Sequence, residues 1–291
     1  MHKRATSSLV GLATLSLAIA ATGCSSDRSL APSGTVLIDA QVSADIAANG
    51  GNAAVADLQD RDQYLLQMGM LPNHVGGAPV AHGDGSPPPN DASAAPKCDY
   101  SEASGHWSCA PFTNARGLTV TRSYAFFNAA GGHMQRFSES ATAKVSYQTE
   151  KHGPVGDGGK FSGVTHRTNN ETTSGLLGAE TTRVWDGAGV SADTVTYRDS
   201  TTARHYAGVR LDSLKGVTFV HPRVAGTYPR SGQTVQVSNY TVTSTGKSTE
   251  TRSVSRRVVT TYNGTEQASM QSGKLTCTLH LDTGKVDGCH S

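Results

Sequence analysis

The chain has 291 residues and a nearly balanced charge, with 25 Lys and Arg residues against 23 Asp and Glu residues. Proteins that bind nucleic acid normally carry a strong basic excess, so this composition argues against that class of function. Charged residues make up 16% of the chain, below the usual share of about 25%. With abundant Gly, Ser and Thr, this composition is typical of an exported, β-rich protein with much uncharged polar surface.

The first 23 residues have the parts of an export signal. Lys3 and Arg4 give a basic start, and a short apolar run extends from Leu9 to Ala21. A membrane-spanning helix needs ~20 apolar residues, so this run predicts a cleavable signal. A cut after Ala20 also fits the small-x-small site of an ordinary secretory signal.

The end of this signal, Ala21-Thr22-Gly23-Cys24, resembles the lipobox of bacterial lipoproteins, although Ala21 stands where that family usually has Leu. The resemblance implies cleavage before Cys24 and acylation of its thiol and new amine, with palmitate among the acyl chains. Cysteine parity agrees, because lipidation of Cys24 leaves four cysteines in an exported chain.

Several acyl chains reinforce one another at ~0.8 kcal/mol per buried methylene, which predicts a stable membrane anchor. Ser25 follows the cysteine where Asp would be a retention signal. By the sorting rules of diderm bacteria, the resemblance therefore implies a lipid-anchored protein of the cell envelope, at the outer membrane and facing the periplasm or the cell surface.

Residues 24–34 contain Pro and Gly without hydrophobic periodicity, which predicts a tether. Residues 35–71 are Ala-rich and form an amphipathic helical segment by their spacing. Apolar residues recur at helical intervals in two stripes, which are Ile38, Val42 and Ile46, then Val55, Leu58, Leu65 and Leu66.

The run Asn49-Gly50-Gly51-Asn52 between these stripes predicts a helix stop followed by an N-cap, and hence two helices. Residues 35–38 fit a strand as well. We expect the stripes to dock on the chain's own sheet. A helix lying on a membrane surface usually carries Lys or Arg, whereas this one carries Asp57, Asp60 and Asp62.

Charge is unevenly distributed. Between Cys24 and Lys97 there are eight Asp residues but only three basic ones, and the later part carries a modest basic excess. One consequence would be a weak attraction between the acidic segment and the later part of the chain. The simpler interpretation, which we prefer, is that the charged residues of both parts lie on the solvated surface.

Residues 72–97 are rich in Pro and Gly and are interpreted as a linker. From residue 98 to residue 291, short apolar–polar alternations follow one another between turn sequences. Strands are predicted at 118–127, 143–148, 195–198, 217–220, 235–242, 254–262 and 267–269, with a last hairpin at 275–286. Their close spacing, without helical patterns between them, predicts a mainly β domain: a large antiparallel meander sheet, which is a curled sheet, half-barrel or sandwich.

Four cysteines bracket the two ends of this domain, and they allow three pairings. We predict the two local disulfides, Cys98–Cys109 and Cys277–Cys289, because each pair flanks a turn-rich segment. A metal site would need closer Cys-x-x-Cys pairs.

Three motifs resemble catalytic sequences without their required partners. Asp282-Thr283-Gly284 resembles the aspartic-protease triplet, but that chemistry needs two such carboxylates and there is no second triplet, so a turn explains it better. The segment 153–160 lacks the spacing of a phosphate-binding loop and is interpreted as a flexible loop. Ser244-Thr245-Gly246-Lys247 matches Ser-x-x-Lys without its companion motifs.

No convergent catalytic set, metal site or cofactor site is therefore predicted. The first functional hypothesis is a non-enzymatic binding or structural module, whose partner is a lipid, a glycan or a protein. A variant is a carrier of lipid or another hydrophobic ligand with a half-barrel sheet. The second hypothesis is an envelope hydrolase, for which His205, Asp199 and Asp193 are the nearest thing to a cluster.

Overall fold

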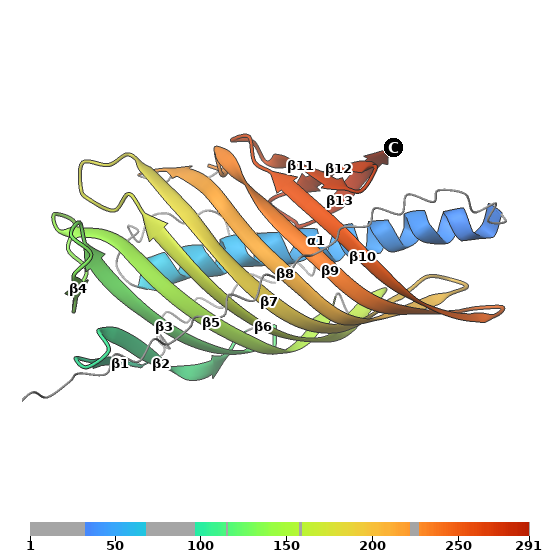
Figure 1. Cartoon of the computed structure of the whole chain (residues 1–291), viewed down its shortest axis with the longest axis horizontal. Coiled ribbons are helices and arrows are strands. Elements are labelled where there is room, and N and C mark those ends of the chain that lie inside the picture. The colour runs from blue at the N-terminus through green and yellow to red at the C-terminus, as the bar shows by residue number, and fades with distance from the viewer. Residues whose placement is uncertain (1–32, 68–96, 115, 157–158, 222–226, 291) are drawn as a thin grey trace, which may run out of the picture.

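The computed structural model describes residues 33–67, 97–114, 116–156, 159–221 and 227–290 (Figure 1). The expected signal at 1–23, most of the tether at 24–34 and most of the linker at 72–97 lie outside these residues, as does Cys24. The described elements are α1 (Ser33–Gln67), β1 (Cys98–Ser101), β2 (His106–Thr113), β3 (Thr119–Asn128), β4 (His133–Met134), β5 (Thr142–Gly156), β6 (Phe161–Ser174), β7 (Thr182–Arg198), β8 (Ala203–Val220), β9 (Ser231–Thr245), β10 (Thr249–Thr261), β11 (Gln267–Ser272), β12 (Leu275–His280) and β13 (Val286–His290).

All of the described strands belong to one antiparallel sheet. Their order in the sheet follows the chain from β1 to β13, and β4 lies beside this path as a second partner of β3. Each long strand thus pairs with the next one through a turn, which confirms the predicted mainly β meander. Of the three arrangements considered, the structure has a single curved sheet that does not close on itself.

One helix, α1, crosses the strands on the inner face of this sheet, and the strands bend around it (Figure 1). The buried apolar residues of helix and sheet form one cluster. The contribution of α1 to that cluster is Val42, Ile46, Ala47, Ala54, Val55, Leu58, Tyr64 and Leu65. The predicted docking of the helical stripes on the chain's own sheet is therefore confirmed.

The prediction of a helix stop at Asn49-Gly50-Gly51-Asn52 is wrong, since α1 is continuous from Ser33 to Gln67. The two glycines serve close packing instead. A Cβ atom on Gly51 would lie 2.7 Å from Val286 Cγ2 and 2.9 Å from Leu279 Cδ1. Without a side chain, this turn of the helix can lie directly against β12 and β13.

The sequence also underestimated the strands in the middle of the sheet. It predicted nothing over β6 and only the last residues of β7, and it interpreted residues 153–160 as a loop. In the structure, Gly153–Gly156 belongs to β5. Hydrophobic alternation is weak here because several inward-facing positions of β6 are polar: Arg167, Asn169, Glu171 and Thr173.

The two disulfides join Cys98 to Cys109 and Cys277 to Cys289, the local pairing that was predicted. The first links β1 to β2, and the second links β12 to β13. Both ends of the sheet are therefore held covalently, where a strand has a neighbour on one side only. Within the described residues, no helix is long and apolar enough to cross a membrane.

The packing of α1 predicts an unusual response to alanine. Gly51→Ala should lower the free energy of unfolding by about 1–3 kcal/mol, because the new methyl group overpacks the contact with Leu279 and Val286. Helix propensity alone would favour Ala over Gly by about 1 kcal/mol. Chemical unfolding distinguishes the two, with Asn52→Ala at the neighbouring exposed position as the control. A stabilised Gly51→Ala protein would contradict the packing explanation.

Candidate functional site

The contact between α1 and the inner face of the sheet is charged as well as apolar. The helix contributes buried Asp45 and Asp57, and the strands facing it contribute buried Arg and Lys side chains. We call these residues the charged interface: Asp45, Asp57, Asp60 and Arg61 of α1 with Lys151, Arg167, Glu171, Asp193, Arg204, Arg210 and Asp212 of the sheet. Part of the attraction between the two parts of the chain is thus buried. For Asp45 and Asp57 the preferred interpretation of solvated surface is wrong.

Asp45 connects the N-terminal half of α1 to β8. Its Oδ2 accepts hydrogen bonds from Arg204 Nε and from the Tyr206 hydroxyl, each at 2.6 Å. Arg204 also reaches Asp199, with 2.8 Å between Nη1 and Oδ2. Burial and the Asp45 carboxylate raise the pKa of Tyr206, so its hydroxyl stays a donor at neutral pH.

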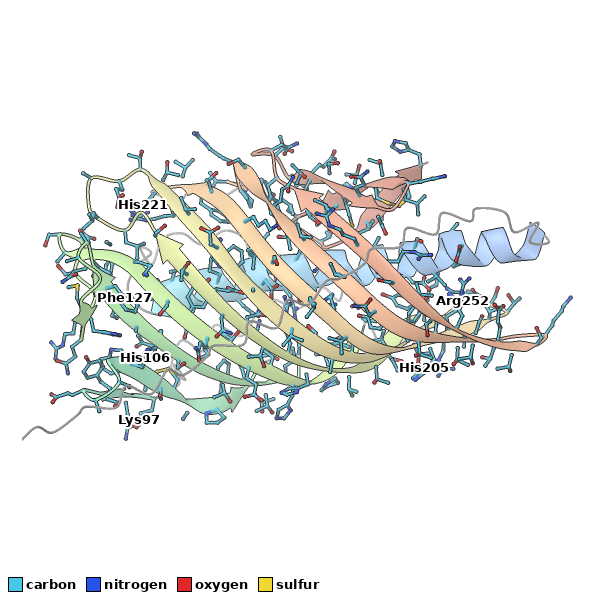
Figure 2. All side chains as sticks on the ribbon, viewed as in Figure 1. Lys97, His106, Phe127, His205, His221 and Arg252 are labelled. Carbon is cyan, nitrogen blue, oxygen red and sulfur yellow. A yellow bond between two sulfur atoms is a disulfide. The ribbon has the colours of Figure 1, made fainter. Side chains whose placement is uncertain are left out.

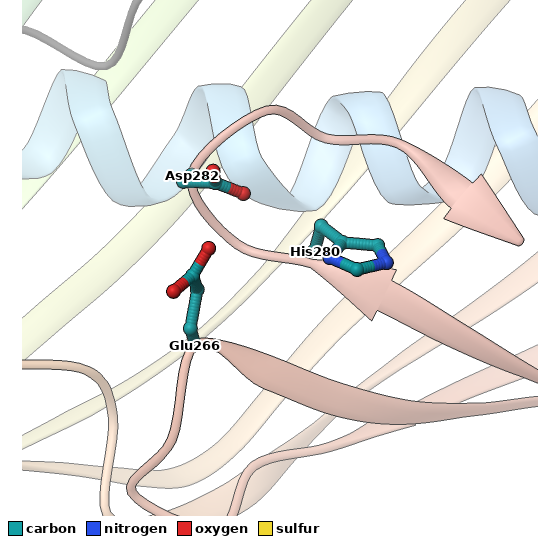
Figure 3. Close-up of side chains that lie close together, drawn as sticks. All are labelled: Glu266, His280 and Asp282. Carbon is teal, nitrogen blue, oxygen red and sulfur yellow. The ribbon is translucent and has the colours of Figure 1, made fainter.

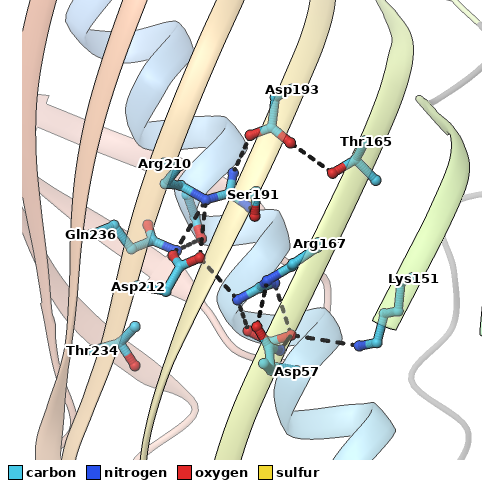
Figure 4. A network of polar contacts seen from close by, with 12 residues as sticks. Asp57, Lys151, Thr165, Arg167, Ser191, Asp193, Arg210, Asp212, Thr234 and Gln236 are labelled. Atoms are coloured by element: carbon cyan, nitrogen blue, oxygen red, sulfur yellow. Dashed lines mark hydrogen bonds and ion pairs between the residues drawn. The ribbon is translucent and has the colours of Figure 1, made fainter. Parts of the chain in front are cut away.

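Asp57 lies at the centre of the interface (Figure 4). The guanidinium of Arg167 on β6 donates from Nη1 to Asp57 Oδ1 at 2.8 Å and from Nη2 to Oδ2 at 2.5 Å. Lys151 on β5 lies 3.7 Å from Asp57 Oδ1 and also donates to Asp60, one turn further along the helix. Such a bidentate guanidinium–carboxylate pair fixes the relative orientation of the two side chains in addition to pairing their charges.

The network continues along the inner face, away from the helix. Arg167 Nη2 lies 3.2 Å from Asp212 Oδ2, and Arg210 bridges Asp212 and Asp193 at 3.3 and 3.2 Å (Figure 4). The Tyr240 hydroxyl donates to Asp193 Oδ2 at 2.8 Å. Cations and carboxylates alternate through this network, so these buried charges lie next to opposite ones.

Arg61 is the basic residue of α1 at this interface, and it packs on aromatic rings. Its guanidinium carbon lies 3.6 Å from the ring centre of Phe219 and 4.3 Å from that of Trp185. The indole nitrogen of Trp185 donates to Glu171 Oε2 at 3.0 Å. Burial, with the negative charge of Asp57, raises the pKa of Glu171 to about 7.

The space left between helix and sheet at the charged interface is small. The cavity beside Asp60 and Glu171 has a volume of about 10 Å³. A cavity needs roughly 10–15 Å³ of this kind of volume to hold one water molecule. At this point the inner face is therefore filled by the chain's own side chains.

The structure does not assemble the cluster considered for a hydrolase. Asp193 faces inward and is bound by Arg210 and Tyr240, whereas His205 is exposed on the opposite face and lies 3.1 Å from Thr196 Oγ1 (Figure 2). Asp199 accepts hydrogen bonds from Thr201 and Thr202 in the turn before β8. The three residues do not form a catalytic site. Successive residues of a strand point to opposite faces of the sheet, and Asp193 and His205 lie on opposite faces.

The triplet at Asp282 forms a turn, as expected, with Asp282 Oδ1 accepting the Thr283 backbone N–H at 2.7 Å. Within the described residues, Asp282 groups with Glu266 and His280, whose potential ligand atoms all lie within 4.8 Å of one another (Figure 3). His280 Nε2 is 3.1 Å from Asp287 Oδ1. Two members of the group thus have partners within the protein, and we assign no metal to it.

Sequence reasoning missed the charged interface, although a signal was present. Charged or polar residues alternate with others along β6 and β8, as in Arg167-Thr168-Asn169 and Arg210-Leu211-Asp212. This is the same period of two that marks an apolar inner face.

Comparison with known protein families, with curated proteins and with solved structures gave no match to this chain.

Removal of one buried charge should test how far the interface holds α1. Asp57→Asn leaves Arg167 and Lys151 facing a neutral amide, and should lower the free energy of unfolding by about 3 kcal/mol. Asp39→Asn is the control. Asp39 also forms an ion pair, with Arg252, but its side chain is 55% exposed, so this substitution should lower the free energy of unfolding by less than about 1 kcal/mol. Equal losses in urea unfolding would contradict a special role for Asp57.

The raised pKa of Glu171 predicts a pH dependence of stability. The ordinary pKa of Glu is 4.5. The protonated Glu171 side chain therefore contributes fully to the stability of the fold below pH 4.5, and this contribution is lost as the pH rises through about 7. Glu171→Gln removes this loss and keeps an acceptor for Trp185. Between pH 4.5 and 7, the free energy of unfolding of the variant should therefore rise relative to that of the wild type by on the order of 3 kcal/mol.

Urea unfolding across this pH range checks that difference. The exposed Glu250→Gln variant should follow the wild-type profile. Parallel profiles for wild type and Glu171→Gln would refute the assignment.

Proposed function

We propose that this chain is a lipid-anchored protein of the cell envelope that acts as a non-enzymatic binding or structural module. The observation that carries this proposal is the charged interface, where α1 closes over the inner face of the sheet. A pocket for a lipid or another hydrophobic ligand is typically an apolar space of about 300–1,000 Å³. At the charged interface the inner face is covered by α1, and the space beside Asp60 has a volume of about 10 Å³. A larger groove of about 690 Å³ lies beside β10, where the basic side chains of Arg256, Arg257 and Lys274 line it.

The same observation argues against the carrier with a half-barrel sheet. Opening a cavity would separate Asp57 from Arg167 and Asp45 from Arg204, which are paired between helix and sheet. Leaving one partner of a buried pair without the other costs about 3–5 kcal/mol. A scaffold with free outer surfaces and edges fits this arrangement better than a container does.

The anchor in the proposal rests on the lipobox resemblance at Ala21-Thr22-Gly23-Cys24. The hydrolase alternative loses its support, because His205, Asp199 and Asp193 do not meet. A lipid anchor with a domain whose inner face is covered by its own helix suits a protein that holds or presents a partner at a membrane surface, at the outer membrane in our proposal.

Cys24→Ser tests the anchor. We expect the wild type in the membrane fraction, with an acylated Cys24 in mass spectrometry of the mature N-terminus. The variant should lose the membrane association, because a hydroxyl cannot form the thioether. Ser25→Ala, which keeps the thiol, should fractionate as the wild type does. Unchanged membrane association of Cys24→Ser, or an unmodified N-terminus at Ala21, would contradict the proposal.

Native mass spectrometry after gentle extraction tests the filled interior separately. We expect the protein with its covalent lipid and no further bound lipid. A stoichiometric, non-covalent lipid that persists in Cys24→Ser would favour the carrier instead.

A further inference from the structure

The two terminal strands of the sheet are short, but a longer unpaired stretch lies inside it. β1 has four residues and β13 has five, and each is joined to its neighbour by a disulfide. β10 pairs with β9 along its whole length, from Thr249 to Thr261. On its other side, β11 pairs only with Val258–Thr261. Within the described residues, positions 249–257 of β10 have no partner strand on that side.

The backbone groups of this stretch point outward at alternate residues. The Tyr262 N–H donates to Gly232 O, on the β9 side, and the register between the two strands has no irregularity. Even-numbered positions therefore bond to β9, and Thr251, Ser253, Ser255 and Arg257 direct their N–H and C=O groups away from it. Consistently, the Ser255 carbonyl accepts the Arg256 side chain at 2.9 Å.

A groove with a volume of about 690 Å³ lies beside this edge. Its walls come from α1, β10 and the turn between β11 and β12, including Asp39, Ser43 and Leu275. Three basic side chains line it: Arg256, Arg257 and Lys274. Asp39 is the acidic residue among the lining residues, and it already lies 2.9 Å from Arg252 and 3.4 Å from Arg256. The groove is thus positively charged.

We propose that the free edge of β10 binds an acidic, extended segment of a partner protein, which adds to the sheet as a further strand. The outward N–H and C=O groups supply the backbone bonds of such an addition, and the basic groove selects for acidic side chains. Nine residues of strand extend about 30 Å, enough for a specific site. The inference rests on the proposed function as a binding module and names the chemistry of its partner.

Charge also argues against a second copy of this chain as the occupant. A second copy docked on this edge would bring a second basic groove, lined by Arg256, Arg257 and Lys274, against the first. Charged residues on an edge strand are a common device against such self-pairing. An acidic partner converts this repulsion into attraction.

The test uses the full mature chain in detergent and a capped nine-residue peptide in which Glu alternates with Val and Thr. We expect saturable one-to-one binding in fluorescence anisotropy, weaker at high salt, and no binding of the matched peptide with Lys for Glu. Arg257→Glu combined with Lys274→Glu should weaken binding at least about tenfold. Lys215→Glu, an exposed change on β8, should leave binding unchanged.

Ser253→Pro separates strand addition from simple charge attraction. It removes an outward N–H that β9 does not use, so the fold should persist while binding falls at least about tenfold. Hydrogen exchange should show fast exchange at Thr251, Ser253, Ser255 and Arg257 without peptide, and protection with it.

Absence of peptide binding would overturn the proposal, as would full binding by Ser253→Pro. Slow exchange at these amides before peptide is added would show that the chain covers its own edge, and would overturn it too. None of these results touches the membrane association of the wild type, which tests the proposed function independently.

Discussion

The structure depends on the pairing of buried charges between α1 and the sheet. Asp57 is 5% exposed, and Arg167 and Lys151 face it from two neighbouring strands. Taking an ion out of water costs several kcal/mol, which only a well-placed opposite charge can offset. Neither the helix nor the inner face of the sheet is therefore a stable surface without the other.

This pairing also restricts how the helix can lie. Apolar contacts tolerate small shifts along the helix axis, but a shift would separate Asp45 from Arg204 as well as Asp57 from Arg167. The close approach at Gly51 adds a steric constraint where the helix meets β12 and β13. The directional ion pairs and the close contact at Gly51 thus select one position for α1 on the sheet.

Because α1 occupies the inner face, the surfaces left for partners are the outer face and the edges of the sheet. The terminal strands are short and joined to their neighbours by disulfides, whereas the β10 edge is long and basic. A domain whose inner face is covered by α1 and whose β10 edge is free suits attachment better than transport. The buried charges thus bear on the proposed role at a membrane surface, because they hold α1 over the inner face.

The sequence by itself determined the features that depend on neighbours in the chain. Strand alternation gave the antiparallel meander, and cysteine spacing gave the pairs Cys98–Cys109 and Cys277–Cys289. Only the tertiary structure decided that α1 continues through Gly50-Gly51, because the reason is contact with Leu279 and Val286, more than two hundred residues away. The charged interface likewise needed the fold. Asp57 and Arg167 are 110 residues apart, and a charged residue in a sequence shows its burial only when its partner is in place.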